Sequence, residues 1–161
     1  QVPFVDGVSS AAYTGVKHAL QATAAGLKDL ARALTFREPY RVPIVSDPKT
    51  FGIMNTPESE PGYMAIVPEG TDWRNECPAR AVLELLFYRP IKRARKVRCP
   101  ALVILGEKDS LINPRAVERA ASRMREVTLV HLPVGHFDVY KGEWFDKVSE
   151  LQADFFARHL L

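Results

Sequence analysis

The spacing of apolar residues changes several times along the chain and predicts where its helices and strands lie. An apolar run over residues 2–5 predicts a short buried strand. Apolar residues then recur at helical spacing, so we expect one long helix over about residues 10–35, weakened at Gly15 and Gly26. The apolar stripe of this helix is formed by Val16, Leu20, Leu27, Leu30 and Leu34.

The stretch from residue 36 to residue 78 shows no long regular pattern. Prolines recur along it, and each one removes a backbone N–H and restricts the residue before it. We therefore expect an insertion built of short turns and helices, which carries several large apolar residues. A second helical pattern over about residues 79–88 leads the chain back to the main body.

The chain is most regular from Cys99 onward. The apolar run 101–105 is typical of a strand buried on both faces of a parallel sheet, and Asn113 followed by Pro114 predicts the start of a helix. A second strand is expected over residues 127–132, followed by a closing amphipathic helix. Strand, helix, strand and helix with short connections form a right-handed parallel unit, so the sequence predicts an α/β fold. The apolar faces of the two helices consist of Val117, Ala120, Ala121 and Met124, then of Trp144, Val148, Leu151 and Phe155.

Composition places the chain among globular domains. Its 161 residues are 47% hydrophobic and 25% charged, which argues against disordered and fibrous proteins. With 22 basic against 19 acidic residues the net charge is only +3, and the basic run 92–98 has no interleaved aromatic residues, so we expect no nucleic-acid partner. No apolar stretch is long enough to span a membrane, and the cysteines, Cys77 and Cys99, lack metal-binding spacing. We expect reduced thiols in a cytoplasmic protein.

Two polar residues follow consecutive predicted strands, at the edge where ligands bind in parallel sheets. Asp109 lies in the segment GEKDS after the first of these strands, and His136 lies in PVGHFD after the second. Because neighbouring strands are about 5 Å apart, the two side chains can meet in a hydrogen bond. An aspartate that fixes the tautomer of a histidine in this way forms an acid–base pair that can take a proton from a nucleophile.

The segments GEKDSLINP and VTLVHLPVGHFDVY, followed by the terminal amphipathic helix, resemble the carboxyl-terminal end of α/β-hydrolase enzymes. The resemblance implies a partial α/β-hydrolase fold, in which helices flank a small parallel sheet. Residues 1–9 are then the sixth strand and its exit, residues 10–98 an irregular helical cap, and residues 99–161 the βαβα end of the core. The resemblance also implies that Asp109 and His136 are the acid and the base of a Ser-His-Asp triad. The cap resembles those of uncharacterised bacterial hydrolases, which implies a small ester or amide substrate and no cofactor.

The position of the nucleophile is open. The segment Gly7-Val8-Ser9-Ser10-Ala11 has the small residues of a nucleophile turn, and Ser9 precedes the acid and the base along the chain as the nucleophile does in the family. However, an alanine stands where the pattern has glycine, and Asp6 puts a charge between strand and turn. We therefore expect the nucleophile and the oxyanion hole to lie upstream of this chain, which would be the inactive carboxyl-terminal part of a serine hydrolase. Asp6 is an alternative acid, because some hydrolases of this fold place the acid after the sixth strand.

Other interpretations remain open. The aspartate at the strand end can simply bond its own backbone in a turn, and the histidine can be a packed loop residue. His131, His136 and Asp138 could be proposed as metal ligands, but His131 lies within the strand, so we expect no metal. The chain could also be a non-catalytic module that binds an apolar ligand. In either function the cap residues expected to line the pocket are Phe51, Tyr63, Met64 and Trp73.

The apolar N-terminal strand predicts self-association. If residues 2–5 form the sixth strand without a fifth, one edge of the sheet presents unpaired backbone groups that favour pairing with another chain. We expect a homodimer or larger homo-oligomer that buries the N-terminal segment, through strand pairing or exchange of residues 1–35.

Overall fold

The chain divides into two compact units in the computed structural model, which describes residues 1–160. The sheet unit comprises Gln1–Val5 together with the residues from Arg89 onward, and the helical unit comprises Asp6–Tyr88. The assignment of residues 10–98 to a cap stays a prediction.

The basic run before the first regular strand belongs to the sheet unit. It forms two short 3-10 helices, η1 (Pro90–Lys92) and η2 (Ala94–Lys96). Their apolar residues Ile91 and Ala94 are buried, whereas the charged residues of the run are exposed. Ile91 also donates its backbone N–H to the carbonyl of Val5 at 2.9 Å. The basic run is therefore part of the sheet unit.

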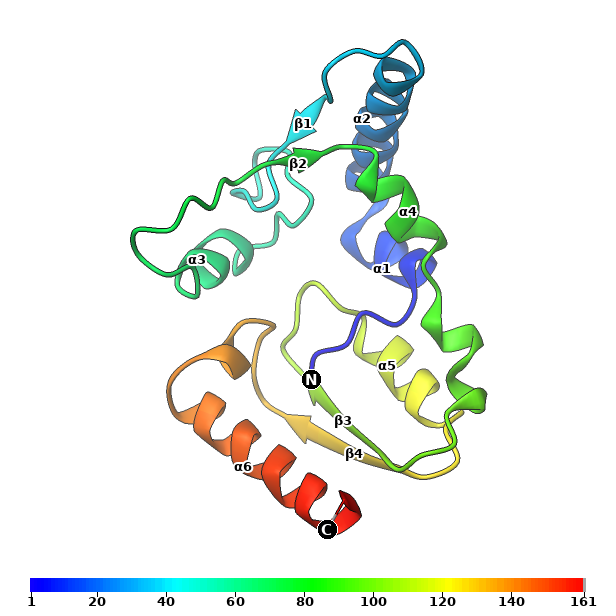
Figure 1. The fold of residues 1–161 in the computed structure, drawn as a ribbon, viewed down its shortest axis with the longest axis vertical. Helices are drawn as coiled ribbons and strands as arrows, with labels where there is room; N and C mark the ends of the chain where they lie inside the picture. The colour runs from blue at the N-terminus through cyan, green and yellow to red at the C-terminus, as the bar shows by residue number, and fades with distance from the viewer. Residues whose placement is uncertain (161) are drawn as a thin grey trace. The chain divides into compact units, whose positions relative to one another are not determined.

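Two parallel strands, β3 (Ala101–Gly106) and β4 (Val127–Leu132), form the sheet of this unit (Figure 1). The two strands are in register over their whole length, from Ala101 opposite Val127 to Gly106 opposite Leu132. The connection runs through helix α5 (Pro114–Ala121), which starts where the sequence predicted. The Asn113 side chain caps this helix by accepting a hydrogen bond from the N–H of Arg115 at 3.1 Å. The predicted strands and their parallel order are confirmed.

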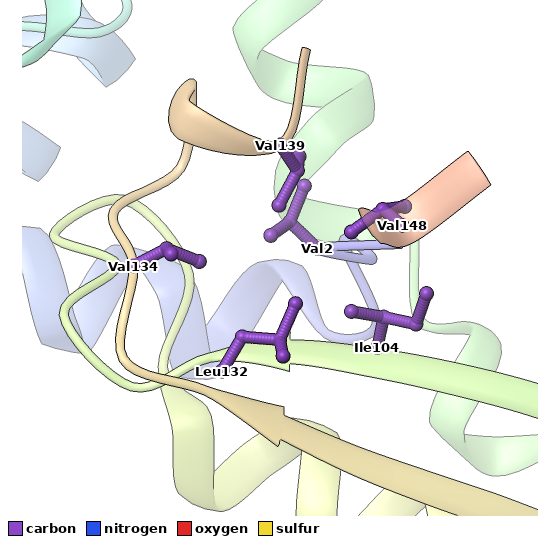
Figure 2. Packing of buried hydrophobic residues seen from close by; sticks show 6 residues of the cluster. All are labelled: Val2, Ile104, Leu132, Val134, Val139 and Val148. Atoms are coloured by element: carbon purple, nitrogen blue, oxygen red, sulfur yellow. The ribbon is translucent and has the colours of Figure 1, made fainter. Parts of the chain in front are cut away.

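Helices cover both sides of the β3–β4 pair. Figure 1 shows α5 on one side and the closing helix α6 (Gly142–Leu160) on the other. Val148 of α6 packs with Ile104 of β3 and Leu132 of β4 in the hydrophobic core drawn in Figure 2. The same core contains Val134 and Val139 from the segment between β4 and α6. This packing anchors both ends of the loop that follows β4.

The predicted N-terminal strand is not formed. Val2 donates its N–H to the carbonyl of Ile104 at 2.8 Å and is buried in the core of Figure 2, so the chain lies beside β3 at Val2. Val2 has a φ of 35°, which no strand residue adopts, and Pro3 has no N–H for a ladder. Val2 and Val5 are both buried, and Pro3 and Phe4 between them are half-buried. The assumption of an exposed apolar edge strand at residues 2–5 is therefore wrong.

The helical unit begins with two helices instead of the single predicted one. They are α1 (Gly7–Thr14) and α2 (Val16–Leu34), and they meet at Gly15, whose φ of 98° and ψ of 151° lie outside the helical region. Glycine adopts such a positive φ without a steric penalty. The weak point at Gly15 is thus a complete break, while the helix continues through Gly26.

Helix α2 packs through its small and polar residues. Gly26 is buried against the side chains of Leu83 and Val82 in α4 (Ala81–Phe87), where a Cβ atom would lie 2.7 Å from Leu83. The other buried residue of α2 is Asp29. The apolar residues of the predicted stripe stay exposed.

The remainder of the helical unit is irregular, as predicted from its prolines. It contains a short antiparallel pair, β1 (Arg41–Val42) with β2 (Cys77–Pro78), and the short helix α3 (Ser59–Met64). Asp29 joins this region to the helices, because its carboxylate accepts the backbone N–H of Tyr40 at 2.6 Å and that of Arg80 at 3.0 Å.

Candidate active site

The loops that leave β3 and β4 bring Asp109 and His136 into direct contact. Nδ1 of His136 lies 2.8 Å from Oδ2 of Asp109. The aspartate side chain is only 3% exposed and that of the histidine 17% exposed, so the contact is shielded from water. Because an ionised carboxylate can only accept hydrogen bonds, the imidazole donates its Nδ1–H. The predicted hydrogen bond between the two side chains is confirmed.

The second oxygen of Asp109 holds the carboxylate in place. Oδ1 accepts the backbone N–H groups of Leu111 and Ile112, each at 2.8 Å. The bond to Leu111 is the turn that a strand-end aspartate commonly makes with its own backbone. The turn and the contact with His136 therefore coexist, because each uses a different carboxylate oxygen. The three hydrogen bonds restrict rotation of the carboxylate and aim Oδ2 at the imidazole.

The loop that carries His136 is braced on both sides of the histidine. Oδ2 of Asp138 accepts the backbone N–H of Gly135 at 2.8 Å. The next element, η3 (Asp138–Tyr140), places Val139 in the hydrophobic core. Phe137 is also buried, and its ring lies edge-on to that of His136 with the centroids 5.0 Å apart. From the sequence, Asp138 was considered only as a metal ligand, and its hydrogen bond with Gly135 was not predicted.

The two exit loops are also joined to each other. Lys108 donates its N–H to the carbonyl of Val134 at 3.0 Å, and Glu107 donates to the carbonyl of Leu132 at 2.8 Å. Gly106 allows this approach, since a Cβ atom there would lie 2.8 Å from the carbonyl oxygen of Val134. The glycine three residues before Asp109, in the segment GEKDS, is the sequence signal that could have predicted this close approach.

Such an arrangement can perform proton transfer. The carboxylate keeps the neutral imidazole in the Nδ1–H tautomer, which leaves the Nε2 lone pair to take a proton. Once protonated, the ring is stabilised by the adjacent negative charge of Asp109. The pair can therefore serve as a general base and then as a general acid for a nucleophile placed near Nε2.

His131 and Cys77 lie outside the pair formed by Asp109 and His136. Among residues 1–160, no group of three or more His, Cys, Asp and Glu side chains is placed to hold a metal ion. His131 lies in β4 with its Nδ1 3.5 Å from Oε1 of Glu107. Burial raises the pKa of the Cys77 thiol, an effect that Asp29 reinforces and Arg41 opposes, so this thiol stays protonated at neutral pH.

Solved structures with the same fold identify the scaffold. No protein-family model matches the chain. A structure of the α/β hydrolase GrgF from Penicillium sp. sh18 superposes with a TM-score of 0.68 at 19% identity and covers 98% of this chain and 53% of that one. The chain has an α/β-hydrolase fold. A structure of DcsB in complex with its substrate analogue agrees, with a TM-score of 0.70 at 17% identity over 89% of this chain and 52% of that one.

Curated relatives match the α/β-hydrolase chain by sequence. The quorum-quenching protein AidA of Acinetobacter baumannii is 31% identical over 158 residues, which are 98% of this chain and 52% of AidA. An uncharacterised 31.7 kDa protein of Escherichia coli, from the traX-finO intergenic region, is 31% identical over 86 residues, which are 52% of this chain and 30% of that protein. The chain spans about half or less of the length of these relatives. It corresponds to a carboxyl-terminal portion of the hydrolase fold, as its motifs implied.

The two remaining residues considered for the site belong to the helical unit. Ser9 lies in the first turn of α1, where the backbone is helical and no residue has a positive φ. It does not occupy the strained strand-to-helix bend that exposes a nucleophile in α/β hydrolases. Asp6 occupies the N-cap position of α1 with its side chain buried, and its carbonyl accepts the N–H of Ser10 at 3.0 Å.

The four residues predicted to line a pocket make the following contacts in the helical unit. Tyr63 and Trp73 stack with their ring centroids 5.2 Å apart and an interplanar angle of 28°. Phe51 instead pairs with His18 at 5.7 Å, and Nε2 of His18 contacts the carbonyl of Gly52 at 2.8 Å. Met64 is exposed, whereas the other three residues are half-buried.

No helix among the described residues combines the length and the apolar character needed to cross a membrane.

Proposed function

We propose that this chain supplies the base and the acid of a serine hydrolase that cleaves small esters or amides. The hydrogen bond between His136 and the buried Asp109 carries the proposal, because it has the geometry of the acid–base half of a Ser-His-Asp triad. The α/β-hydrolase fold supports it, since the two residues leave the carboxyl ends of adjacent parallel strands.

In the proposed reaction the serine Oγ–H gives its proton to Nε2 of His136 as the oxygen attacks the acyl carbon. The imidazolium then protonates the leaving alcohol or amine, and an acyl-enzyme remains. Water attacks this ester with His136 again as the base, and the proton returns to the serine as the acid product leaves. Asp109 keeps its charge throughout and stabilises the imidazolium.

The serine itself is proposed to come from a segment that this chain does not include. The helical conformation at Ser9 argues against Ser9 as the nucleophile. The isolated chain is then expected to hydrolyse activated esters no faster than free imidazole does, because it lacks a nucleophile and an oxyanion hole. Turnover above that level that disappears in Ser9→Ala would show that Ser9 is the nucleophile.

The test of the acid–base roles uses the hydrolase extended upstream to include a nucleophile turn. Asp109→Asn replaces the acceptor opposite Nδ1 with an amide and should favour the wrong imidazole tautomer, lowering kcat by about 10⁴-fold. His136→Ala should have a comparable effect. Asp47→Asn, an exposed aspartate of the helical unit, is the matched control and should leave kcat unchanged. A loss of less than about tenfold in Asp109→Asn would refute the assignment.

One observation favours a second function, a module that binds an apolar ligand without catalysis. The stacked, half-buried rings of Tyr63 and Trp73 offer an aromatic surface for such a ligand. Titration with a fatty-acid ester, followed by Trp fluorescence, separates the two functions. A binding module predicts saturable quenching that Trp73→Ala abolishes and an extended protein that turns over no substrate, whereas the hydrolase predicts turnover that depends on His136.

A further inference from the structure

The sheet unit carries many basic residues at the edge where its two strands begin. Residues 89–98 lead into β3 and include six basic residues and no acidic one. Residues 115–125 comprise most of α5 and the turn before β4, and they include four basic residues and one acidic residue. We call these two segments the basic edge. Because the whole chain has 22 basic and 19 acidic residues, the rest of it holds 12 basic and 18 acidic residues. The basic edge is therefore a local excess of positive charge on a chain that is otherwise negative.

The structure joins the two segments of the basic edge. Nη1 of Arg123 donates a hydrogen bond to the carbonyl of Ile91 at 3.2 Å, and α5 packs beside η1 (Figure 1). Arg115 and Arg119 are exposed and four residues apart, so they share one face of α5. Arg123 continues this row just beyond the helix end. The arginine row of α5 and the basic run 92–98 therefore meet at Arg123.

The apolar residues of the basic edge are already covered within the sheet unit. Ile91 of η1 and Ala94 of η2 are buried, as are Val117 and Ala120 of α5. The lysines and arginines between residues 92 and 98 and between residues 115 and 125 are exposed. A further part of a hydrolase fold could cover an apolar face, but the burial of so many cations would require a matching set of acidic partners. We therefore expect the basic edge to remain in water in a longer hydrolase.

The basic run 92–98 has no acidic partner among the described residues. The ion pairs found within residues 1–160 join other side chains, and none of them involves Lys92, Arg93, Arg95, Lys96 or Arg98. Like charges placed this close together repel one another, so a surface that brings negative charge to the run stabilises it. The charge of the basic edge therefore calls for an anionic partner.

We propose that the basic edge binds the surface of a membrane that contains anionic phospholipids. Lysines and arginines beside such a surface are attracted by the charge of the lipid headgroups, and the attraction adds up over several side chains. A nucleic acid fits this edge less well, because none of its residues is an aromatic one on which a base could stack. The edge also offers no basic helix to a duplex groove, since η1 and η2 have three residues each and Glu118 interrupts the basic face of α5. A bilayer surface requires neither feature.

Binding through the basic edge holds the acid–base pair away from the membrane. β3 and β4 begin at the basic edge and run to the loops that carry Asp109 and His136. A strand of six residues spans about 20 Å, so the pair lies beyond the opposite edge of the sheet. Vesicle binding is therefore independent of the proposed proton transfer, and His136→Ala should bind vesicles like the wild type.

Co-sedimentation with lipid vesicles measures this binding. The probes are vesicles of phosphatidylcholine with about 30% phosphatidylserine and vesicles of phosphatidylcholine alone, each in about 0.05 M and about 0.5 M salt. The chain should bind the anionic vesicles at low salt and should not bind the neutral ones. Because salt screens exposed charges, the affinity for the anionic vesicles should fall by at least about tenfold at high salt.

Two double variants with the same change in net charge locate the binding surface. Arg93→Glu with Lys96→Glu reverses two charges of the basic edge and should lower the affinity for anionic vesicles by at least about tenfold. Lys141→Glu with Lys147→Glu, at the start of α6 and just before it, is the matched control and should keep most of the binding. All four side chains are exposed, and far-UV circular dichroism should show that both double variants keep the wild-type fold.

The proposal is overturned if the wild-type chain does not bind the anionic vesicles at low salt, or if the control loses as much affinity as the variant of the basic edge. Binding to a short DNA duplex but not to vesicles, lost in Arg93→Glu with Lys96→Glu, would assign the edge to a nucleic acid instead. The hydrolase extended upstream should bind the anionic vesicles as the chain does, and loss of binding there would show that another part of the protein covers the edge.

Discussion

Asp29 is the most deeply buried charge of the helical unit, and its removal should strongly destabilise that unit. The side chain is 0% exposed, and its Oδ2 also contacts Nε of Arg80 at 3.0 Å. Asp29→Ala leaves the backbone N–H groups of Tyr40 and Arg80 without their acceptor, at about 1 to 3 kcal/mol for each unsatisfied donor. Breaking a buried ion pair costs about 3 to 5 kcal/mol in all. Because Arg80 is 36% exposed and can turn toward water, we expect about 3 kcal/mol, a large part of the about 5 to 15 kcal/mol that stabilises a typical protein.

Denaturant unfolding measures this loss of stability, and tryptophan fluorescence can restrict the measurement to the helical unit. The chain has two tryptophans, Trp73 in the helical unit and Trp144 in the sheet unit. In a Trp144→Phe background the fluorescence therefore follows the helical unit alone. Asp47→Ala is the control, because Asp47 is exposed and only accepts the N–H of Lys49 in a turn, so it should cost less than about 1 kcal/mol. An Asp29→Ala variant that loses no more than this control would refute the reasoning.

The same carboxyl predicts an acid dependence of stability. Burial alone would raise the pKa of Asp29, but hydrogen bonds from the backbone of Arg80 and Tyr40 and the charges of Arg80 and Arg32 outweigh it, so the pKa is lowered. The unfolded chain then binds a proton at higher pH than the folded chain, and the stabilisation is lost as the pH falls through the lowered pKa. The difference in unfolding free energy between wild type and Asp29→Asn should therefore shrink below about pH 4, near the ordinary pKa of aspartate. A difference that stays constant down to pH 2 would contradict this assignment.

Three further variants test the sheet unit. Gly106→Ala should lower the unfolding free energy by about 1 to 3 kcal/mol, because the added methyl group overpacks the loops. It should also shift the imidazole ¹⁵N resonances of His136, and unchanged resonances would show that the loops tolerate the methyl group. Asp138→Ala removes the acceptor of the Gly135 N–H and should reduce the Nδ1–H tautomer of His136 in long-range ¹H–¹⁵N spectra, whereas Asp138→Asn keeps an acceptor oxygen and should restore it. Asn113→Ala removes a helix cap and should lower the unfolding free energy by about 1 kcal/mol in the same denaturant assay, without moving the His136 signals.

The sequence by itself determined the sheet unit well, because its signals are local. The run 101–105, the cap at Asn113 and the apolar spacing of the last helix each depend on neighbouring residues only, and the structure confirms all three. The contact between Asp109 and His136 could also be predicted, since adjacent parallel strands release their loops at the same edge.

Only the tertiary structure decided which atoms hold that contact in place. The second carboxylate oxygen of Asp109, the brace from Asp138 and the close approach at Gly106 depend on how two loops pack, which no spacing along the chain records. The same holds for residues 2–5, whose apolar run predicts burial equally well for a strand and for the irregular segment that the structure shows. An apolar stripe likewise shows that a face avoids water, but whether that face is covered depends on the surfaces that reach it, and on α2 none does within the helical unit. Local patterns set the elements, whereas long-range packing sets the partners of each side chain.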